Sequence, residues 1–314
     1  MSTNLTDTEA RTPAMAPGLR TTGHSLTLQL LTSGYEAEVL TFLAERSLHT
    51  VCMTGLILEN GLRSPSNRGD FYACLDAAGQ LEGVALIGHA TLIEARSDAV
   101  IEAFARLAQN NPRAHLIRGE QEMIERFLGY YQPIGYQPRL MCRELLFEQR
   151  YCALTPETVN NLRQATLDDL GQIMTVNAEM IFEESGINPL QTDLTGFSRR
   201  TARRIEQGRI WVWIENKRLI FKTDVMSDTP EVIYLEGVFV NSEERGKGYG
   251  LLCFTQLCHR LLERAKSICL LVNEHNEAGI NLYKKAGYTL QGYYDTVYLQ
   301  REKPQKDKDL SGIE

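Results

Sequence analysis

The sequence predicts an α+β protein built from two copies of one plan in tandem. Short runs of alternating apolar residues, typical of strands, are mixed along the chain with longer runs that have the 3.6-residue spacing of helices. The same order of such runs is found twice, before and after residues 148–160. Identity between the two halves is too low to prove duplication, but a repeated plan is the simplest account of this order.

The length and composition of the chain fit two globular domains. The 314 residues are 43% hydrophobic and 23% charged, and at about 100–200 residues per domain this length gives about two domains. The chain opens with a polar stretch rich in Thr, Ala and Pro that lacks the apolar segment of a signal peptide. We therefore expect a disordered lead at 1–24, domains at 25–150 and 160–302, and a polar tail at 303–314.

Charge, hydropathy and cysteine usage argue against several classes of protein. The formal charge is 33 minus 40, or −7, with no long basic run, so nucleic acid is not an expected partner. The longest apolar runs, VALIG and ICLLV, are far shorter than the roughly 20 residues of a membrane-spanning helix. Seven cysteines, an odd number without a CxxC pair, argue against a disulfide framework or a zinc site. We expect no bound metal, no membrane association and a reducing cytoplasm; the oligomeric state cannot be predicted.

The first half begins with a short strand, SLTLQLL. One helical stretch follows, YEAEVLTFLAERSLHTVCMTGLILENG, and ends at Gly61 as a helix cap. Two apolar runs, FYACLD and LEGVALIGHATLIEA, lie on either side of Asp76-Ala-Ala-Gly79 and predict a hairpin. A helix (DAVIEAFARLAQ), a strand (RAHLIRG), a helix (EQEMIERFLGYY) and two closing strands (IGYQ and RLMCRELLFE) complete this half.

The second half repeats this order with clearer signals. It starts with a strand (NLRQAT), a helix (LDDLGQIMTVNAEMIF), a loop (EESGINPLQ), a helix (TGFSRRTARRIEQ) and a strand (RIWVWIE). A turn at Asn216 and Lys217 leads to the strands RLIFKTDV and EVIYLEGVFV. They are followed by a helix (YGLLCFTQLCHRLLERA), a strand (ICLLVN), a helix (EAGINLYKKA) and the strands YTLQGYY and DTVYLQ.

Three glycines in five residues stand where a predicted strand leads into a predicted helix, in EGVFVNSEERGKGYGLL. Gly246, Gly248 and Gly250 leave backbone N–H groups uncovered and permit positive φ, so successive N–H groups can converge on one anion. The first N–H groups of the following helix have no partner inside it and add to this effect. Arg245 and Lys247 would add charged contacts, so the stretch is typical of a phosphate-binding loop.

Two common nucleotide-binding motifs do not match this loop. The sequence lacks the GxxxxGK[ST] of a P-loop, and Leu251 stands where a Rossmann fingerprint needs its third glycine. A glycine-rich turn required only by tight packing of the strand against the helix is the structural alternative to a phosphate site.

A second motif, LLVNEHNEAGINLYKKAGY at 270–288, favours the phosphate site over a turn required only by packing. Asn273 ends a predicted strand, Asn276 is a residue type that begins helices, and Tyr283 follows two helical turns later. The combination of R-G-x-G-x-G with N-x-x-[AG]-x-x-L-Y-x-K-x-G-[YF] strongly resembles the GNAT superfamily of acetyl-CoA-dependent N-acetyltransferases, over essentially all of residues 160–300. The chain is also similar to a two-half GNAT subfamily that shares MIFEESG, FKTDV, EGVFV and YDTVYL, and whose first half is a degenerate copy.

The resemblance implies both a fold and a cofactor site. Each half is expected to form a GNAT-like fold with a mixed, mostly antiparallel twisted sheet flanked by helices. In the second half the resemblance implies that the strand before the loop pairs with the pantetheine arm of acetyl-CoA, that the loop holds the pyrophosphate, and that Tyr283 returns a proton to the CoA thiolate. The cofactor-binding residues implied in this way are Val238, Phe239, Val240, Arg245, Gly246, Lys247, Gly248, Tyr249, Gly250, Asn273 and Asn276.

Acetylation of an amine also needs a general base, because a protonated amine has no lone pair with which to attack. Glu236, on the strand EGVFV, is the first candidate; a strand carboxylate paired with Lys or Arg is its structural alternative. Asp224, on the neighbouring strand, is the rival base. We expect Asp224 to contact the substrate, together with Glu183 and Glu184 in the predicted loop, unless those two are merely solvated. Tyr283 has core packing as its structural alternative.

The first half lacks the signals of a cofactor site. No glycine follows Gly88 at the corresponding place, and Glu94 and Asp98 stand where groups that bind an anion would be needed. We therefore expect this half to brace the active half or to form a wall of its acceptor pocket.

These features predict an N-acetyltransferase. It would move an acetyl group from acetyl-CoA to a primary amine of a small molecule or peptide by direct attack in a ternary complex. The alternative is a non-catalytic acyl-CoA sensor or regulatory module, and a protein-interaction scaffold is a third class. The acceptor amine cannot be deduced from the sequence.

Overall fold

The computed structural model describes residues 26–132, 134–152 and 159–300 of the chain. The predicted lead and tail lie outside the described residues, as does most of the segment between the halves. In the first half the elements are β1 (Thr27–Leu30), α1 (Glu36–Ala44), α2 (Ser47–Asn60), β2 (Gly69–Leu75), β3 (Leu81–Gly88), β4 (Ala90–Ala95), α3 (Asp98–Ala108), β5 (Leu116–Glu120), α4 (Gln121–Tyr131) and β6 (Pro138–Gln149).

The second half has the same order of elements, with the short helix α6 added. They are β7 (Arg163–Gln164), α5 (Leu170–Ser185), α6 (Pro189–Thr192), α7 (Leu194–Glu206), β8 (Ile210–Glu215), β9 (Arg218–Asp228), β10 (Val232–Val240), α8 (Tyr249–Leu262), β11 (Ser267–Asn273), α9 (Glu277–Lys285) and β12 (Thr289–Leu299). The α+β class and the repeated plan are confirmed.

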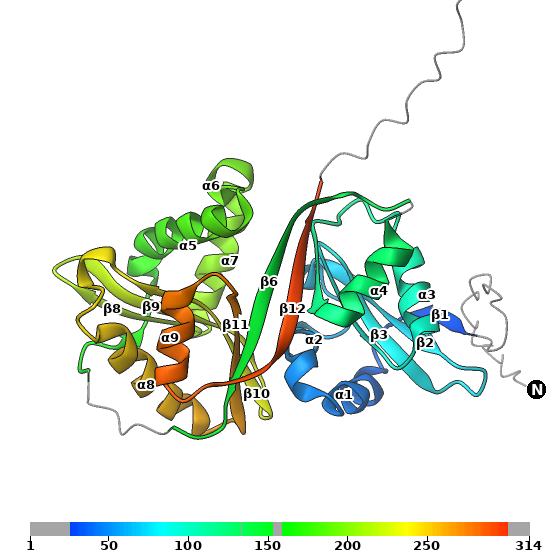
Figure 1. Ribbon diagram of the computed structural model, residues 1–314, viewed down its shortest axis with the longest axis horizontal. Helices are drawn as coiled ribbons and strands as arrows, with labels where there is room; N and C mark the ends of the chain where they lie inside the picture. Colours follow the sequence, from blue (N-terminus) through cyan, green and yellow to red (C-terminus); the bar gives the residue numbers. More distant parts are fainter. Residues whose placement is uncertain (1–25, 133, 153–158, 301–314) are drawn as a thin grey trace, which may run out of the picture.

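All these strands form one continuous sheet, in the order β1-β2-β3-β4-β5-β12-β6-β11-β10-β9-β8-β7. Within the described residues, β4 pairs with β5 and β10 with β11 in parallel, and the other pairs are antiparallel. The last strands of the two halves have changed places. β6, which ends the first half, pairs with β11, and β12, which ends the second, pairs with β5 (Figure 1).

The exchanged strands carry core residues into the opposite half. Phe147 of β6 is 1% exposed and packs in a cluster with Phe254, Leu257 and Tyr283 of the second half. Val297 of β12 packs in the main cluster of the first half. Because each core is completed by a strand of the other half, neither half has a complete core of its own.

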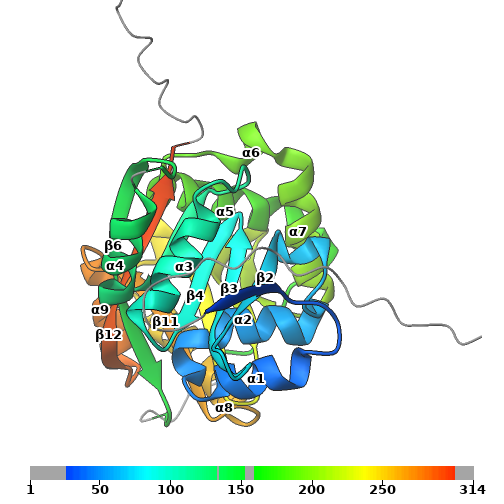
Figure 2. The ribbon, with the colours of Figure 1, turned by 90° about the vertical axis from the view of Figure 1, so that its right-hand side faces the viewer.

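Helices cover both faces of the sheet (Figure 2). Phe221 of β9 packs with the residues of α8, whereas the next residue, Lys222, contacts Asn177 of α5. Since successive side chains of a strand face opposite sides, α5 and α8 cover opposite faces. Helix α2 of the first half contacts β9 and β10 of the second, on the α5 face.

Several boundaries differ from those that the sequence predicted. The single helix predicted over the first helical stretch is interrupted, because α1 ends at Ala44 and α2 begins at Ser47. Between them Arg46 turns toward the sheet, where it binds Glu94 at 3.0 Å and Glu120 at 2.5 Å. These two ion pairs are tertiary contacts that helical spacing cannot show.

Three further predictions were wrong in detail. Residues 134–137 do not form a strand, and β12 is one strand with a register shift rather than two strands. The predicted loop EESGINPLQ is helical in part: α5 continues to Ser185, and Gly186, with φ 68°, then ends it. The predicted turn at Asn216 and Lys217 is confirmed, with positive φ at both residues.

The strand exchange predicts that the halves unfold together. We expect Phe147→Ala to lower the free energy of unfolding by about 3–5 kcal/mol through loss of buried surface and a cavity. Denaturation followed by tryptophan fluorescence, which reports only on β8 in the second half, and by far-UV circular dichroism should give one coincident transition.

A matched control lies on the same strand. Met141→Ala, at a side chain that is 54% exposed, should change the free energy of unfolding by less than about 1 kcal/mol. The contrary result would be two transitions in Phe147→Ala. If the fluorescence transition shifts to lower denaturant while part of the dichroism change stays at the wild-type midpoint, the halves unfold independently.

Candidate active site

The predicted phosphate loop connects β10 to α8. A turn of 3-10 helix at Ser242–Glu244 follows β10, and Gly248, with φ 86°, precedes α8. Gly246 also has positive φ, 78°, and both glycines have open space where a side chain would begin. No described side chain caps α8, so its first N–H groups remain available to an anion. The local geometry is that of an anion cradle.

Both basic residues of this loop have partners in the protein. The Lys247 ammonium lies 2.8 Å from Glu244, and Arg245 Nε donates to the Val240 carbonyl at 3.2 Å. Arg218 also binds Glu244. The hydrogen bond from Lys247 is the main reason why the pKa of the Glu244 carboxyl is lowered. A phosphate would therefore compete with Glu244 for Lys247, while the backbone N–H groups face no such competitor.

A gap opens between β10 and β11 just before this loop. Their parallel pairing ends at Leu235 and Leu270. Gly237, with φ 62°, then forms a bulge, and β10 continues in contact with β9 alone. The edge of residues 238–240 that faces β11 therefore has no strand paired with it, and the sequence predicted contact with pantetheine there.

Tyr283 lies on α9 at this gap, on the α8 face of the sheet. The side chain is 7% exposed, and its ring packs against Phe147, Phe254 and Tyr288. Burial, followed by the effects of Cys258 and then Glu184, raises the pKa of the phenol, so it keeps its proton at neutral pH. The structure thus combines core packing of the ring with a protonated hydroxyl.

The two predicted asparagines shape the connection between β11 and α9. Asn276 Oδ1 accepts from the Gly279 N–H at 2.9 Å and caps α9. Asn273 Oδ1 accepts from the His275 N–H at 2.9 Å. Tyr249, at the start of α8, packs edge-on against Trp213. Their roles in cofactor binding remain predictions.

Three carboxylates gather on the opposite, α5 face around one arginine of the first half. Arg118 of β5 lies 3.0 Å from Glu236 and 3.7 Å from Glu144, and it donates to Thr296 at 2.8 Å. Tyr234 donates a hydrogen bond to Glu236 as well. Burial opposes the charge of Arg118, but the carboxylates of Glu144 and Glu236 raise its pKa overall. Glu236 is therefore held in place by an ion pair with Arg118 and a hydrogen bond from Tyr234.

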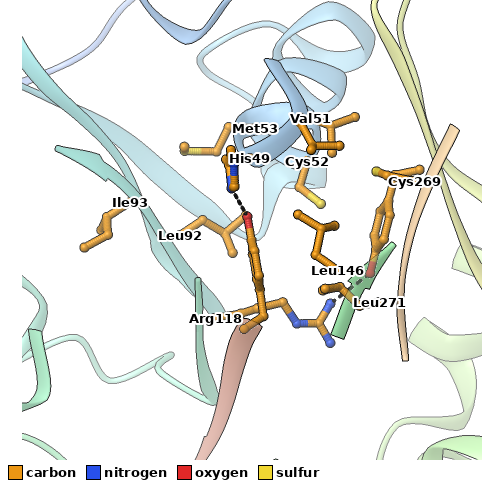
Figure 3. Close-up of a pocket in the computed structure, with 13 residues that line it drawn as sticks. His49, Val51, Cys52, Met53, Leu92, Ile93, Arg118, Leu146, Cys269 and Leu271 are labelled. Atoms are coloured by element: carbon orange, nitrogen blue, oxygen red, sulfur yellow. Dashed lines mark hydrogen bonds between the residues drawn. The ribbon is translucent and has the colours of Figure 1, made fainter. Parts of the chain in front are cut away.

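A small apolar pocket lies beside Arg118, beneath α2 (Figure 3). Val51, Leu146 and Leu271 are among the side chains that line it. They keep water from one side of the guanidinium, which strengthens its contacts with the carboxylates.

Glu184 is the third carboxylate of this group. It lies in the last turn of α5, is accessible to solvent, and has no hydrogen bond or ion pair with any described residue. Loss of water around it, followed by the charges of Glu236 and Glu144, raises the pKa of Glu184 to about 7. Its neighbour Glu183 is exposed and lies about 100° away around the helix axis.

Asp224 is engaged elsewhere on the same face. It lies 3.1 Å from the ammonium of Lys222 and 3.8 Å from Arg204. Lys222 is fully buried and also donates to Asn177 and to the Gly237 carbonyl. Burial lowers the pKa of Lys222, and Asp224 opposes that shift. This pair supports the bulge at Gly237 and leaves Asp224 little freedom to bind a substrate.

Sequence reasoning missed the residues that the first half brings to this site. Arg118, Glu144 and Arg139, whose guanidinium donates to the Ser185 carbonyl at 2.6 Å, all belong to β5 or β6. The available signal was weak: charged residues inside the predicted strands RAHLIRG and RLMCRELLFE.

The first half has a corresponding gap, between β4 and β5, but it is closed. Their pairing ends at Thr91 and Ile117. Arg46 then bridges Glu94 of β4 and Glu120 of β5, and only residues 96–97 separate β4 from α3. The gap is filled by an ion pair, and no glycine loop follows it.

One protein family matches part of the second half. Residues 181–288 match the model of the Acetyltransferase (GNAT) family. No match to the chain is found among curated proteins.

Solved structures show the same fold over most of the chain. A Drosophila protein superposes with a TM-score of 0.65 at 13% identity, covering 87% of this chain and 98% of its own. A tandem GNAT protein from the clavulanic acid biosynthesis pathway gives 0.56 at 12%, covering 88% and 99%. A GNAT-family acetyltransferase from Colwellia psychrerythraea gives 0.51 at 12%, covering 87% and 100%.

The fold and the family match define the class of this protein as an acyltransferase with tandem GNAT-like halves. The part of the second half at residues 181–288 matches the GNAT acetyltransferase family, and that family uses acetyl-CoA. Within the described ranges no helix could cross a membrane and no cluster of His, Cys, Asp or Glu could hold a metal.

The buried pair predicts a structural role for Asp224. Asp224→Asn leaves the Lys222 ammonium without its counter-charge, so we expect the free energy of unfolding to fall by about 3–5 kcal/mol. Asp228→Asn, on the same strand, removes only a surface pair with Arg264 and should cost less than about 1 kcal/mol. Equal effects in urea denaturation would contradict this role.

Proposed function

We propose that the protein transfers an acetyl group from acetyl-CoA to a primary amine of a small molecule or peptide, by direct attack in a ternary complex. The observation that carries this proposal is the alignment of an anion cradle, an unpaired strand edge and a protonated tyrosine along one gap of the second half. Membership of residues 181–288 in an acetyltransferase family supports the chemistry.

The residues of the second half fit acetyl-CoA. The N–H groups at Gly246, Gly248 and the start of α8 would bind the pyrophosphate, joined by Arg245 and, once it leaves Glu244, Lys247. The free edge of residues 238–240 would pair with the pantetheine arm and polarise the thioester carbonyl. When bound, acetyl-CoA supplies the activated acetyl group.

The protein's own contribution is to hold the acceptor and to move protons. On the α5 face the carboxylates would attract an ammonium and take its proton. On the α8 face the Tyr283 hydroxyl would protonate the departing sulfur. The amine would thus approach from the face that the first half helps to enclose, which gives that half a role at the acceptor site.

The setting of the enzyme is also part of the proposal. We infer a cytoplasmic location, since all seven cysteines are free thiols. A net charge of −7 favours a cationic small molecule or peptide over nucleic acid as the partner.

Replacement of Tyr283 tests catalysis directly. We expect Tyr283→Phe to lower kcat by about 100-fold or more while the acetyl-CoA dissociation constant stays within about threefold, because the hydroxyl acts on the leaving group. Release of free CoA thiol and calorimetric titration measure the two quantities. Tyr288→Phe, which removes a hydroxyl from the same aromatic cluster, is the control and should keep its turnover.

Replacement of Gly248 tests the cradle. Gly248→Ala places a side chain at φ 86°, which costs about 1–2 kcal/mol, and we expect acetyl-CoA to bind about tenfold more weakly or worse. Tight binding without thiol release from any amine by the wild type would favour the acyl-CoA sensor. No binding at all would favour the interaction scaffold.

A further inference from the structure

The end of α5 is fixed in a way that holds Glu184 in place. Gly186 ends the helix and its N–H binds the Phe182 carbonyl at 2.8 Å. The Ser185 hydroxyl donates to Ile181 and accepts from the Ile187 N–H. Arg139 of β6 donates to the Ser185 carbonyl from the other side. The last turn is therefore tied both to itself and to the first half.

The three carboxylates around Arg118 are not equivalent. Glu236 has two donors, the Arg118 guanidinium and the Tyr234 hydroxyl. Glu144 is paired with Arg118 and also accepts from Thr296. If either of them took up a proton, these donors would lose their acceptor. Glu184 has no donor among the described residues, so it can take up a proton without breaking a contact.

Electrostatics make Glu184 ready for proton transfer near neutral pH. Partial loss of water around the carboxyl group, together with the charges of Glu236 and Glu144, holds its pKa at about 7, against the opposing charges of Arg118 and Lys222. A base of this strength is ionised in part at neutral pH and still binds a proton well.

Glu184 is also near enough to Tyr283 to act on it electrostatically. They belong to α5 and α9, on opposite faces of the sheet, and the charge of Glu184 acts on the Tyr283 phenol. An acceptor nitrogen placed between them would have a proton acceptor on one side and the thioester on the other.

We propose that Glu184 is the general base of this enzyme and that Arg118, supplied by the first half, is a positioning residue that holds Glu236 in an ion pair and out of the proton transfer. This inference rests on the acetyl transfer proposed above. It differs from the prediction that Glu236 is the base, which stays the rival assignment, and it gives the first half a part in building the acceptor site.

The step balances in atoms and charge. Glu184 takes one proton from the ammonium, and the free nitrogen lone pair forms a bond to the acetyl carbon while the carbon–sulfur bond breaks. The sulfur leaves with the bonding pair and takes the Tyr283 proton. The second amine proton returns to the Tyr283 oxygen through solvent, and Glu184 releases its proton to water, so one proton leaves per turnover.

The pH dependence of kcat/KM tests this assignment. The acceptor is whichever of spermidine, benzylamine, glucosamine and glycylglycine the wild type acetylates fastest, with acetyl-CoA saturating. A base acts only when ionised, so wild-type kcat/KM should rise with pH through about 7 and then level off. In Glu184→Gln we expect a loss of about 10²–10⁴-fold at pH 7.5, and the rise should move up to the pKa of the amine itself.

Matched variants separate this role from a structural one. Glu179→Gln, on the same helix and exposed, should keep its activity within about twofold. Glu236→Gln and Arg118→Met should raise KM or lower kcat but keep a rise that belongs to Glu184. The rise should move to lower pH in Glu236→Gln, which removes a charge that raises the Glu184 pKa, and to higher pH in Arg118→Met, which removes a charge that lowers it. All variants should bind acetyl-CoA as the wild type does.

Two results would overturn the assignment. If Glu184→Gln keeps the rise near pH 7 and Glu236→Gln loses it, Glu236 is the base. If the carboxyl resonance that titrates near pH 7 in ¹³C NMR of labelled protein persists in Glu184→Gln, the titrating group is another residue. A wild type that acetylates none of the four amines would instead overturn the proposed function, and this inference with it.

Discussion

The exchange of β6 and β12 between the halves is the constraint on which the rest of the structure depends. It inserts a strand of each half into the sheet of the other and so makes twelve strands into one sheet. It also brings Arg118 and Glu144 of the first half next to Glu236 of the second. The proposed acceptor side of the site would therefore exist only when both halves are folded together, which would give a half without a phosphate loop a physical reason to be present.

The two halves share a topology but differ where a cofactor would bind. In the second half a glycine loop over residues 241–248 separates β10 from α8, and the gap before it has an unpaired strand edge. In the first half the connection from β4 to α3 is only residues 96–97, and Arg46 closes the gap with two ion pairs. The negative charge of Glu94 therefore does not face a ligand. It binds Arg46, and this ion pair closes the gap. The same fold thus has an open gap for a proposed cofactor site in the second half and a closed gap in the first half.

Much of this could be predicted from the sequence, for identifiable reasons. The strands and helices of the second half have strong periodicity, and Gly246, Gly248 and the Asn216 turn announce backbone conformations that few other residues adopt. Apolar periodicity, however, cannot show which strand a strand pairs with. For that reason the sequence could not predict the exchange of β6 and β12. It also could not predict that Arg118 would contact Glu236. The break at Arg46 and the extra helical turn that carries Glu184 depend likewise on tertiary contacts and caps rather than on spacing.

A crystal structure of the protein with bound acetyl-CoA would test most directly whether the gap of the second half is the cofactor site. We expect one molecule per chain, with its diphosphate on the N–H groups of Gly246 to Gly250 and its thioester between Glu184 and Tyr283. A coenzyme bound at the gap of the first half, or a diphosphate that contacts side chains alone while the backbone of the loop turns away, would contradict this expectation.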